Sequence, residues 1–429
     1  MSLNRSIAPP SQELSWVQIP EVKTTILANH IPLHLIQAGE QEVCRLEVIY
    51  KAGTTTEAKN NISYLTAKML PCGTKRHDEA SISEYFERYG ASFEPHHSPD
   101  RVILTLYCLT KFLPKVLPLL IEILQESIFP EKELAQLKNI SLQNLKVNLE
   151  KNNYVAGREF RRLLFQSYPP YASSLEEKAL EEASQNDLFQ HYQKHIQHQP
   201  FELILTGKVD TQSYEYVART FEQLGIQSPI TMQFVPSCFQ PVHDRYCIET
   251  AHNLQASIRM GKLCLPKNHP DFFAFNVLNE ALGGYFGSRL MKNIREEKGY
   301  TYGIYSQIVH LEKASYQVIS TDVKQEYAQA TIEEIQREIY RLQTELIEKQ
   351  ELTRLKNYLL GSFASMLSNC FDLAEIFKGI HFFGLSYHFY QQYWQTIHQI
   401  SPEILQETAK KYLQPEKMLT VVVGTKLEQ

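Results

Sequence analysis

Residues 278–306 carry the most informative pattern in the chain and read LNEALGGYFGSRLMKNIREEKGYTYGIYS. Apolar residues recur at helical spacing up to Leu282, so a helix is expected there. Gly283 and Gly284 follow at once. Because residues without a Cβ atom suit a chain reversal, the glycine pair is expected to end this helix.

A second helix is expected directly after the reversal, since the apolar residues at 290, 291 and 294 are again helically spaced. It is expected to end near Gly299, and alternation over residues 300–304 then predicts a strand. Arg295 therefore belongs to the last turn of a helix, and Tyr302 to the start of the strand that follows. A guanidinium and a phenol are both hydrogen-bond donors.

The segment resembles the C-terminal half of the pitrilysin/insulinase zinc metallopeptidases, the inverzincins of the H-x-x-E-H motif. The resemblance is carried by Gly-Gly followed by Ser-Arg-Leu, and then by Ile-Arg-Glu-Glu-Lys-Gly-x-x-Tyr. Taken alone, the charged run 295–298 is typical of a solvent-exposed helix end, and the longer segment makes the resemblance specific. The resemblance implies catalytic roles for Arg295 and Tyr302, which would hold the substrate carbonyl and the oxyanion formed on it. It also implies substrate-binding positions in the same segment, at Gly283, Gly284, Ser288 and Arg289.

The zinc-binding helix of that family is where this sequence departs from it. Residues 61–74 fit the family's register, and the family's His, Glu and His would fall at Tyr64, Ala67 and Lys68. Zinc needs neutral imidazole ligands, and hydrolysis needs a carboxylate that takes a proton from water. The window for the third ligand, residues 143–148, contains no carboxylate. We therefore expect this chain to hold no catalytic zinc and no other cofactor of its own.

Two pairs of histidines could be taken for metal ligands, but the sequence does not favour a metal site at either pair. His191 and His195 have a spacing that suits one metal ion, but Lys194 occupies the position where the family motif has its Glu. A solvated helix is therefore expected there. His96 and His97 lie before a Ser-Pro pair and are expected in a turn between strands.

Composition excludes several classes of function. The 429 residues include 48 acids and 43 bases, and the net charge of −5 gives no general attraction to nucleic acid. No run approaches the roughly 20 apolar residues of a membrane helix. The N-terminus lacks the apolar core of a secretory signal, so a cytoplasmic location is expected, or a periplasmic one if a signal was removed. The seven cysteines form no C-x-x-C pair and are interpreted as reduced thiols.

An internal duplication organises the chain. Ser184 precedes a helix and a buried strand that ends at Gly207, and Ser401 precedes the same order of elements up to Gly424 at the same spacing. Proline-rich residues 227–244 lie between the halves. The expected parts are an N-terminal arm (1–23), a peptidase-like domain with the degenerate zinc motif (24–226), this linker, and a second peptidase-like domain with the Arg/Tyr pair (245–429).

The order of expected elements predicts an α+β fold with two homologous halves, each a mostly antiparallel sheet covered by helices, arranged as a half-clamshell. In the first half we expect a hairpin over 24–36, strands over 43–50, 92–94 and 102–108, and helices over 82–89, 112–127 and 131–150. In the second half we expect strands near 245–250, 256–265 and 314–322, and helices over 325–343 and 349–377. The aromatic-rich run 381–394 is interpreted as core packing.

The resemblance also implies a partner. In bacterial two-subunit members of the family, one subunit carries H-x-x-E-H and the other carries the Arg/Tyr pair, and the two close around an extended peptide. This sequence resembles the second kind, so its expected partners are a homologous zinc-bearing subunit and a peptide substrate. Two alternatives remain open: a structural subunit, as in the respiratory bc1 complex, and a homodimer that binds peptides without cleaving them.

Overall fold

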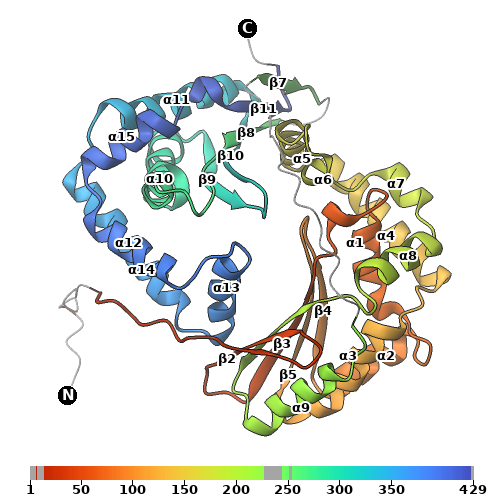
Figure 1. The fold of residues 1–429 in the computed structure, drawn as a ribbon. Coiled ribbons are helices and arrows are strands. Elements are labelled where there is room, and N and C mark those ends of the chain that lie inside the picture. Colours follow the sequence, from red (N-terminus) through yellow and green to blue (C-terminus); the bar gives the residue numbers. More distant parts are fainter. Residues whose placement is uncertain (1–5, 7–13, 227–243, 251–253, 427–429) are drawn as a thin grey trace.

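A computed structural model describes residues 6, 14–226, 244–250 and 254–426. Most of the expected N-terminal arm and nearly all of the expected linker lie outside the described residues. The described chain contains two β-sheets, and most of its helices lie on the outer sides of these sheets (Figure 1).

The sheet of the first half has the strand order β1-β2-β6-β3-β5-β4. All neighbouring strands are antiparallel except β2 and β6, which are parallel. The strands are β1 (Lys23–Ile26), β2 (Pro32–Gln37), β3 (Val43–Tyr50), β4 (Ser92–His97), β5 (Val102–Leu109) and β6 (Glu202–Gly207).

The sheet of the second half repeats this topology. Its order is β7-β11-β8-β10-β9, which matches β2-β6-β3-β5-β4, and the one parallel pair, β7 with β11, matches β2 with β6. The strands are β7 (Arg245–Ile248), β8 (Gln255–Leu263), β9 (Thr301–His310), β10 (Ser315–Lys324) and β11 (Leu419–Val423). The predicted α+β fold of two homologous halves is therefore confirmed.

Each half also contains helices, most of which cover the outer face of its own sheet. In the first half they are α1 (Ile62–Met69), α2 (Glu79–Arg88), α3 (Leu113–Glu126), α4 (Glu131–Leu149), α5 (Asn152–Leu164), α6 (Pro169–Ala172), α7 (Glu177–Glu182), α8 (Gln185–His195) and α9 (Thr211–Glu222). In the second half they are α10 (Phe272–Asn279), α11 (Ala328–Thr344), α12 (Lys349–Met366), α13 (Cys370–His381), α14 (His388–Gln399) and α15 (Pro402–Tyr412). Two π-helical segments, Glu280–Gly284 and Met291–Glu297, complete the second half.

The residues that revealed the duplication have matching conformations. Ser184 caps α8 by accepting a hydrogen bond from the Asp187 amide, and Ser401 caps α15 in the same way. Gly207 and Gly424 both have a positive φ, +127° and +112°. A Cβ atom on either would lie within 2.4 Å of a carbonyl oxygen on the neighbouring strand, so glycine is required at both positions.

Each half gives one helix to the other half's sheet. Helix α5, from the first half, packs on β8 and β11, where its Phe160 and Leu164 join a cluster with Val421 of the second sheet. Helix α13, from the second half, packs on β2 and β6. Figure 1 shows these two helices on the inner faces of the two sheets. The inner face of each sheet is therefore covered by the opposite half.

Helix α13 is fastened to the first sheet by a buried ion pair. The Lys378 ammonium lies 2.7 Å from a Glu47 carboxylate oxygen, and the Arg45 guanidinium lies 3.1 Å from the other oxygen of that carboxylate. Arg45 also donates to the carbonyl of Phe371, close to the start of α13. The pairing joins two charged residues of β3, Arg45 and Glu47, to Lys378, which lies 331 positions beyond Glu47, and it fixes α13 along the sheet.

The two halves are also in contact through two turns between strands. The turn between β9 and β10 meets the turn between β4 and β5, where the Glu312 amide donates to an Asp100 carboxylate oxygen at 3.0 Å. Glu312 also forms an ion pair with Arg101. This contact joins the halves in addition to the packing of α5 and of α13.

Four details of the sequence analysis are corrected by the structure. The helix expected over 349–377 is wrong, because Asn369 caps a new helix by accepting from the Phe371 amide. The turn expected at His96 and His97 is also wrong, because both residues belong to β4 and pair with β5. His191 is buried and not solvated. The helices around the glycine pair contain π turns, which apolar spacing alone does not distinguish from α turns.

The interpretation of the aromatic run is confirmed at Trp394. Its indole is 7% exposed and lies 5.6 Å, between ring centroids, from Trp16 and 6.0 Å from Phe363.

We predict that Lys378→Met lowers the free energy of unfolding by about 3 kcal/mol, because Glu47 then remains buried with Arg45 as its only cationic partner. Urea denaturation measures the effect. Lys410→Met, on the exposed face of α15, is the matched control and is expected to stay within about 0.5 kcal/mol of the unsubstituted protein. Equal losses in the two variants would contradict the role given to the buried pair.

Candidate functional site

Arg295 lies in the last turn of the π-helical segment Met291–Glu297, close to the position that the sequence predicted. Its side chain is half-buried, and the guanidinium carbon lies 4.7 Å from the ring centroid of Phe286. Phe286 is itself 59% exposed. The aromatic face therefore orients the guanidinium without neutralising its charge.

A buried polar network attaches the π-helical segment to helix α11. The Asn293 amide nitrogen donates to Glu334 at 3.0 Å and to Glu338 at 2.7 Å, both on α11. Lys298, just beyond the segment, pairs with Glu334 at 3.1 Å. Burial disfavours the charge on Glu334, but the hydrogen bonds from Asn293 and Lys298 outweigh it and hold the pKa of this carboxyl below its ordinary value. The backbone that carries Arg295 is therefore held firmly.

Tyr302 lies at the start of β9, as predicted, and its side chain is 92% exposed. The strand and the helix before it are tied together, because the Tyr300 amide donates to the Ile294 carbonyl at 3.0 Å. Strand β9 is an edge strand, with β10 as its one neighbour in the described sheet. Within the described residues, the side chains of Arg295 and Tyr302 form no ion pair and no hydrogen bond. Both side chains can therefore bind a ligand.

The other four residues of the segment have structural contacts. A Cβ atom on Gly283 would lie 2.8 Å from Ser306 on β9, and one on Gly284 would lie 2.3 Å from the Glu280 carboxylate. Ser288 is buried. The Arg289 guanidinium pairs with the Glu351 carboxylate through two hydrogen bonds, of 2.8 and 3.2 Å. These contacts explain why the four positions have these residue types. That the four residues also contact a substrate stays a prediction.

The degenerate zinc position lies on α1 and does not fit the metal. Ala67 is fully buried, and Lys68 is exposed and lines a cavity of about 630 Å³ between the first sheet and α13. The Tyr64 ring packs edge-on against His97, with 6.0 Å between centroids. His97 is occupied by a 2.8 Å hydrogen bond to Ser63. A buried methyl, a phenol and an ammonium give zinc no ligand set here.

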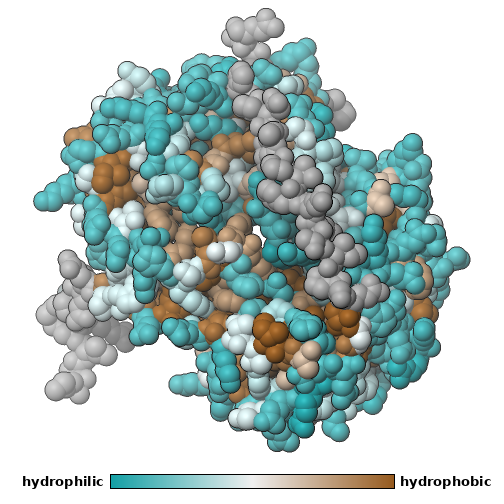
Figure 2. Space-filling model, viewed as in Figure 1, coloured by the Kyte–Doolittle hydropathy of each residue, from teal (hydrophilic) through white to brown (hydrophobic). Residues whose placement is uncertain are grey.

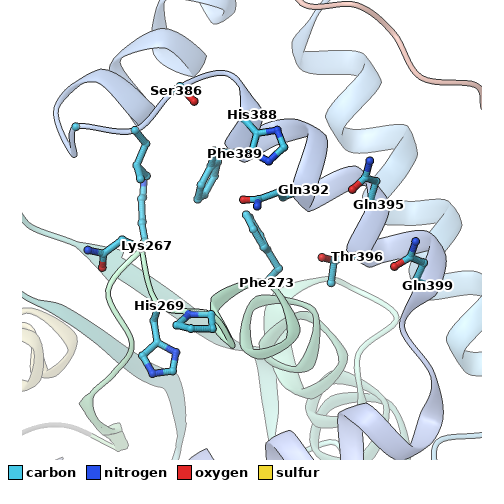
Figure 3. A pocket seen from close by; sticks show the side chains of 14 residues that line it. Lys267, His269, Phe273, Ser386, His388, Phe389, Gln392, Gln395, Thr396 and Gln399 are labelled. Atoms are coloured by element: carbon cyan, nitrogen blue, oxygen red, sulfur yellow. The ribbon is translucent and has the colours of Figure 1, made fainter.

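Figure 3 shows a second cavity, of about 600 Å³, between the start of α10 and helix α14. Phe273 and Phe389 face one another in it at 4.8 Å between centroids. Burial lowers the pKa of Lys267 to about 8, and its ammonium donates to the Gly379 carbonyl. No carboxylate is among the described residues that line this cavity, so it offers no acid and base pair for hydrolysis.

The space between the halves is lined by apolar side chains and, where α13 meets the first sheet, by charged ones. In Figure 2 hydrophobic side chains gather in the hollow between the two halves, while most of the outer rim is hydrophilic. This distribution suits a surface that meets another molecule from the inner side.

Comparison with known families identifies the chain. Residues 34–166 match the family described as insulinase (peptidase family M16), and residues 182–359 match the peptidase M16 inactive domain. The chain belongs to the M16 family. The first match lies within the first half. The second begins just before α8 of the first half, runs into α12 of the second half, and contains Arg295 and Tyr302.

Relatives in the M16 family carry differing descriptions. The non-peptidase homologue YmxG of Helicobacter pylori is 22% identical over 97% of this chain and 94% of its own length. The uncharacterised zinc protease YmxG of Bacillus subtilis is 22% identical over 71% of this chain and 73% of its own. Subunit 1 of the mouse mitochondrial cytochrome b-c1 complex is 23% identical over 62% of this chain and 56% of its own. A chain without the zinc motif fits the non-peptidase description among these.

Solved structures share the fold. The M16 inactive domain of Pseudomonas fluorescens superposes with a TM-score of 0.85 at 22% identity, over 96% of this chain and 100% of that one. A Helicobacter pylori protease gives a TM-score of 0.84 at 18% identity, over 95% and 100%. None of the helices described here has the length and hydrophobicity that a membrane span requires.

The sequence analysis missed the residues that support the site. Phe286 lies inside the diagnostic segment next to Tyr285, but local sequence does not tell which side chain an aromatic ring contacts. Asn293 gave a usable signal, because a polar residue between Met291 and Ile294 falls on the apolar face of the predicted helix. A buried polar residue of this kind needs a partner, which Glu334 and Glu338 provide.

Gly283→Ala is expected to destabilise the protein by about 1–3 kcal/mol, because the new methyl group overlaps Ser306 on β9. Gly361→Ala is the matched control. Gly361 lies inside α12 with open space around its Cβ position, so alanine should stabilise by about 0.5–1 kcal/mol. Thermal unfolding of both variants measures the difference, and a stabilised Gly283→Ala protein would refute the close approach.

Asn293→Ala is expected to lower the free energy of unfolding by about 2 kcal/mol at pH 7, since two buried carboxylates lose a donor. The folded-state pKa of Glu334 lies below its unfolded value of 4.5, so this stabilisation is complete above pH 4.5 and is lost as the pH falls through the folded-state pKa. Urea unfolding at pH 7 and at pH 4 measures the difference between the two proteins. A difference that does not shrink in acid would contradict this account.

Proposed function

We propose that this chain is the zinc-less subunit of a two-subunit peptidase and that Arg295 and Tyr302 act in trans on a peptide bound at the partner's zinc. The guanidinium and the phenol hydroxyl would donate hydrogen bonds to the scissile carbonyl oxygen. These bonds would strengthen as that oxygen becomes negatively charged. The zinc and the base that activates water would come from a homologous subunit with an intact H-x-x-E-H.

The observation that carries the proposal is an asymmetry between the halves. The first half has Tyr64, Ala67 and Lys68 where the family has its zinc ligands and base. The second half keeps both donors, without partners among the described residues, on a backbone anchored by Asn293. If the chain had lost all function, Arg295 and Tyr302 would be expected to have been lost together with the zinc ligands and the base.

The edge strand β9 supports a peptide substrate. Its outer edge is unpaired in the described sheet, and Tyr302 lies at one end of it. An extended peptide can add to such an edge through main-chain hydrogen bonds, which bind many sequences. The apolar hollow beside it would take the side chains.

A structural subunit is the second candidate, because subunit 1 of the mouse cytochrome b-c1 complex is among the similar proteins. In that case the fold would serve assembly, and Arg295 and Tyr302 would contribute nothing to catalysis.

The test combines this chain with a zinc-bearing homologue that carries an intact H-x-x-E-H, followed by purification of the complex and an assay of peptide cleavage. Arg295→Ala and Tyr302→Phe are each expected to lower kcat by about 100- to 1000-fold, since each removes one donor to the oxyanion. Complex formation should be unchanged in both variants.

Arg88→Ala and Tyr340→Phe are the matched controls, because both side chains are exposed on helices of the outer layer. Both should retain full turnover. Unchanged turnover in the Arg295 and Tyr302 variants would exclude the catalytic role, and a complex that forms without peptidase activity would favour the structural subunit.

A further inference from the structure

Three side chains from distant parts of the chain meet where α13 crosses the first sheet. They are His34 on β2, Glu202 at the start of β6 and His381 at the end of α13. Their candidate ligand atoms all lie within 4.8 Å of one another. Within the described part of the chain, this is the one group of three or more His, Cys, Asp or Glu side chains that is close enough to share an ion.

The geometry of the trio is near to that of a metal site. His381 Nε2 lies 2.7 Å from a Glu202 carboxylate oxygen, and His34 Nε2 lies 4.0 Å from the same oxygen. Tetrahedral zinc with ligand bonds of about 2.0–2.2 Å separates its ligand atoms by about 3.3 Å. The 2.7 Å contact would lengthen and the 4.0 Å contact would shorten, each by less than about 1 Å, and no pair of ligand atoms would have to approach by more than about 1.5 Å, which side-chain rotation can provide.

His34 is the member that a simple ion pair leaves unexplained. Its side chain is 3% exposed, and its Nε2 is buried without a hydrogen-bond partner. Its Nδ1 lies 2.8 Å from the Thr24 hydroxyl, which fixes the ring orientation. A buried and unsatisfied ring nitrogen costs about 1–3 kcal/mol. An ion bound at Nε2 would remove that cost, and Thr24 would then support the ligand as such partners commonly do.

The surroundings leave Glu202 available to an ion. The nearby cation Arg101 is already paired with Glu312 and lies over the Phe382 ring, 3.7 Å from its centroid. Glu202 also lines a cavity of about 710 Å³, which gives an ion a path from solvent and leaves room for a water as fourth ligand.

We propose that His34, Glu202 and His381 bind a zinc ion that fastens α13 of the second half to the sheet of the first half. Two imidazoles and one carboxylate are a ligand set that zinc accepts. The site is separate from the degenerate position on α1 and does not depend on the peptidase proposal. Because the ligands come from both halves, binding would stabilise the assembled molecule.

The test uses the isolated full chain, stripped with a chelator and then titrated with Zn²⁺ alone. Calorimetry and elemental analysis should give one zinc per chain, and the thermal unfolding midpoint should rise with zinc concentration. Glu202→Gln and His381→Gln keep the size of each side chain and should weaken zinc binding at least 100-fold. Thr24→Val, at an exposed position, should weaken it about 10-fold.

His388→Ala and His195→Ala are the controls. His388 is exposed on α14, and His195 belongs to the His191 pair and lines the same cavity as Glu202. Both should bind zinc normally. Circular dichroism confirms that each variant is folded. Absence of stoichiometric zinc in the unsubstituted chain would overturn the proposal, as would full binding by Glu202→Gln and His381→Gln or loss of binding through His195→Ala.

Discussion

The rest of the structure depends on the exchange of α5 and α13 between the two halves. Each sheet has one face covered by its own helices, and its other face would expose apolar strands to water if nothing crossed over. Helix α5 covers that face of the second sheet, and α13 covers it in the first. The buried pair of Glu47 and Lys378 fixes the position of α13, because a charge inside the molecule has to lie against its counter-charge.

The exchange of α5 and α13 also bears on the position of Arg295 and Tyr302. Each half relies on the other for part of its core, which opposes rotation of one half against the other, and β4 and β9 are each one edge strand of their sheets. On that frame the π-helical segment presents Arg295, and the network around Asn293 keeps its backbone in place. In the role proposed for Arg295, a donor that is already oriented would stabilise a developing charge without reorganising, so a rigid support would serve that role better than a mobile loop.

The two halves have diverged around the same topology. In the first half, Ser63 and His97 bond to one another beside the former zinc position, and Lys68 projects into the cavity. In the second half, the corresponding edge strand carries the exposed Tyr302, and the helical segment before it carries Arg295 over the ring of Phe286. The family match therefore explains the fold of both halves, whereas the chemistry of each half is decided by a few side chains at its inner edge.

The sequence by itself determined the local elements, the duplication and the place of the donor pair. Caps at Ser184 and Ser401, the glycine pair and the alternation in β9 depend on neighbours within a few residues, which is the range that periodicity reports. The break at Asn369, the strand position of His97 and the π turns were missed, because they depend on bonds that local spacing does not specify. Only the tertiary structure decided that Glu47 meets Lys378 and that His34 meets Glu202 and His381. These residues are separated by much of the chain, and burial brings them together only after the crossed helices have packed.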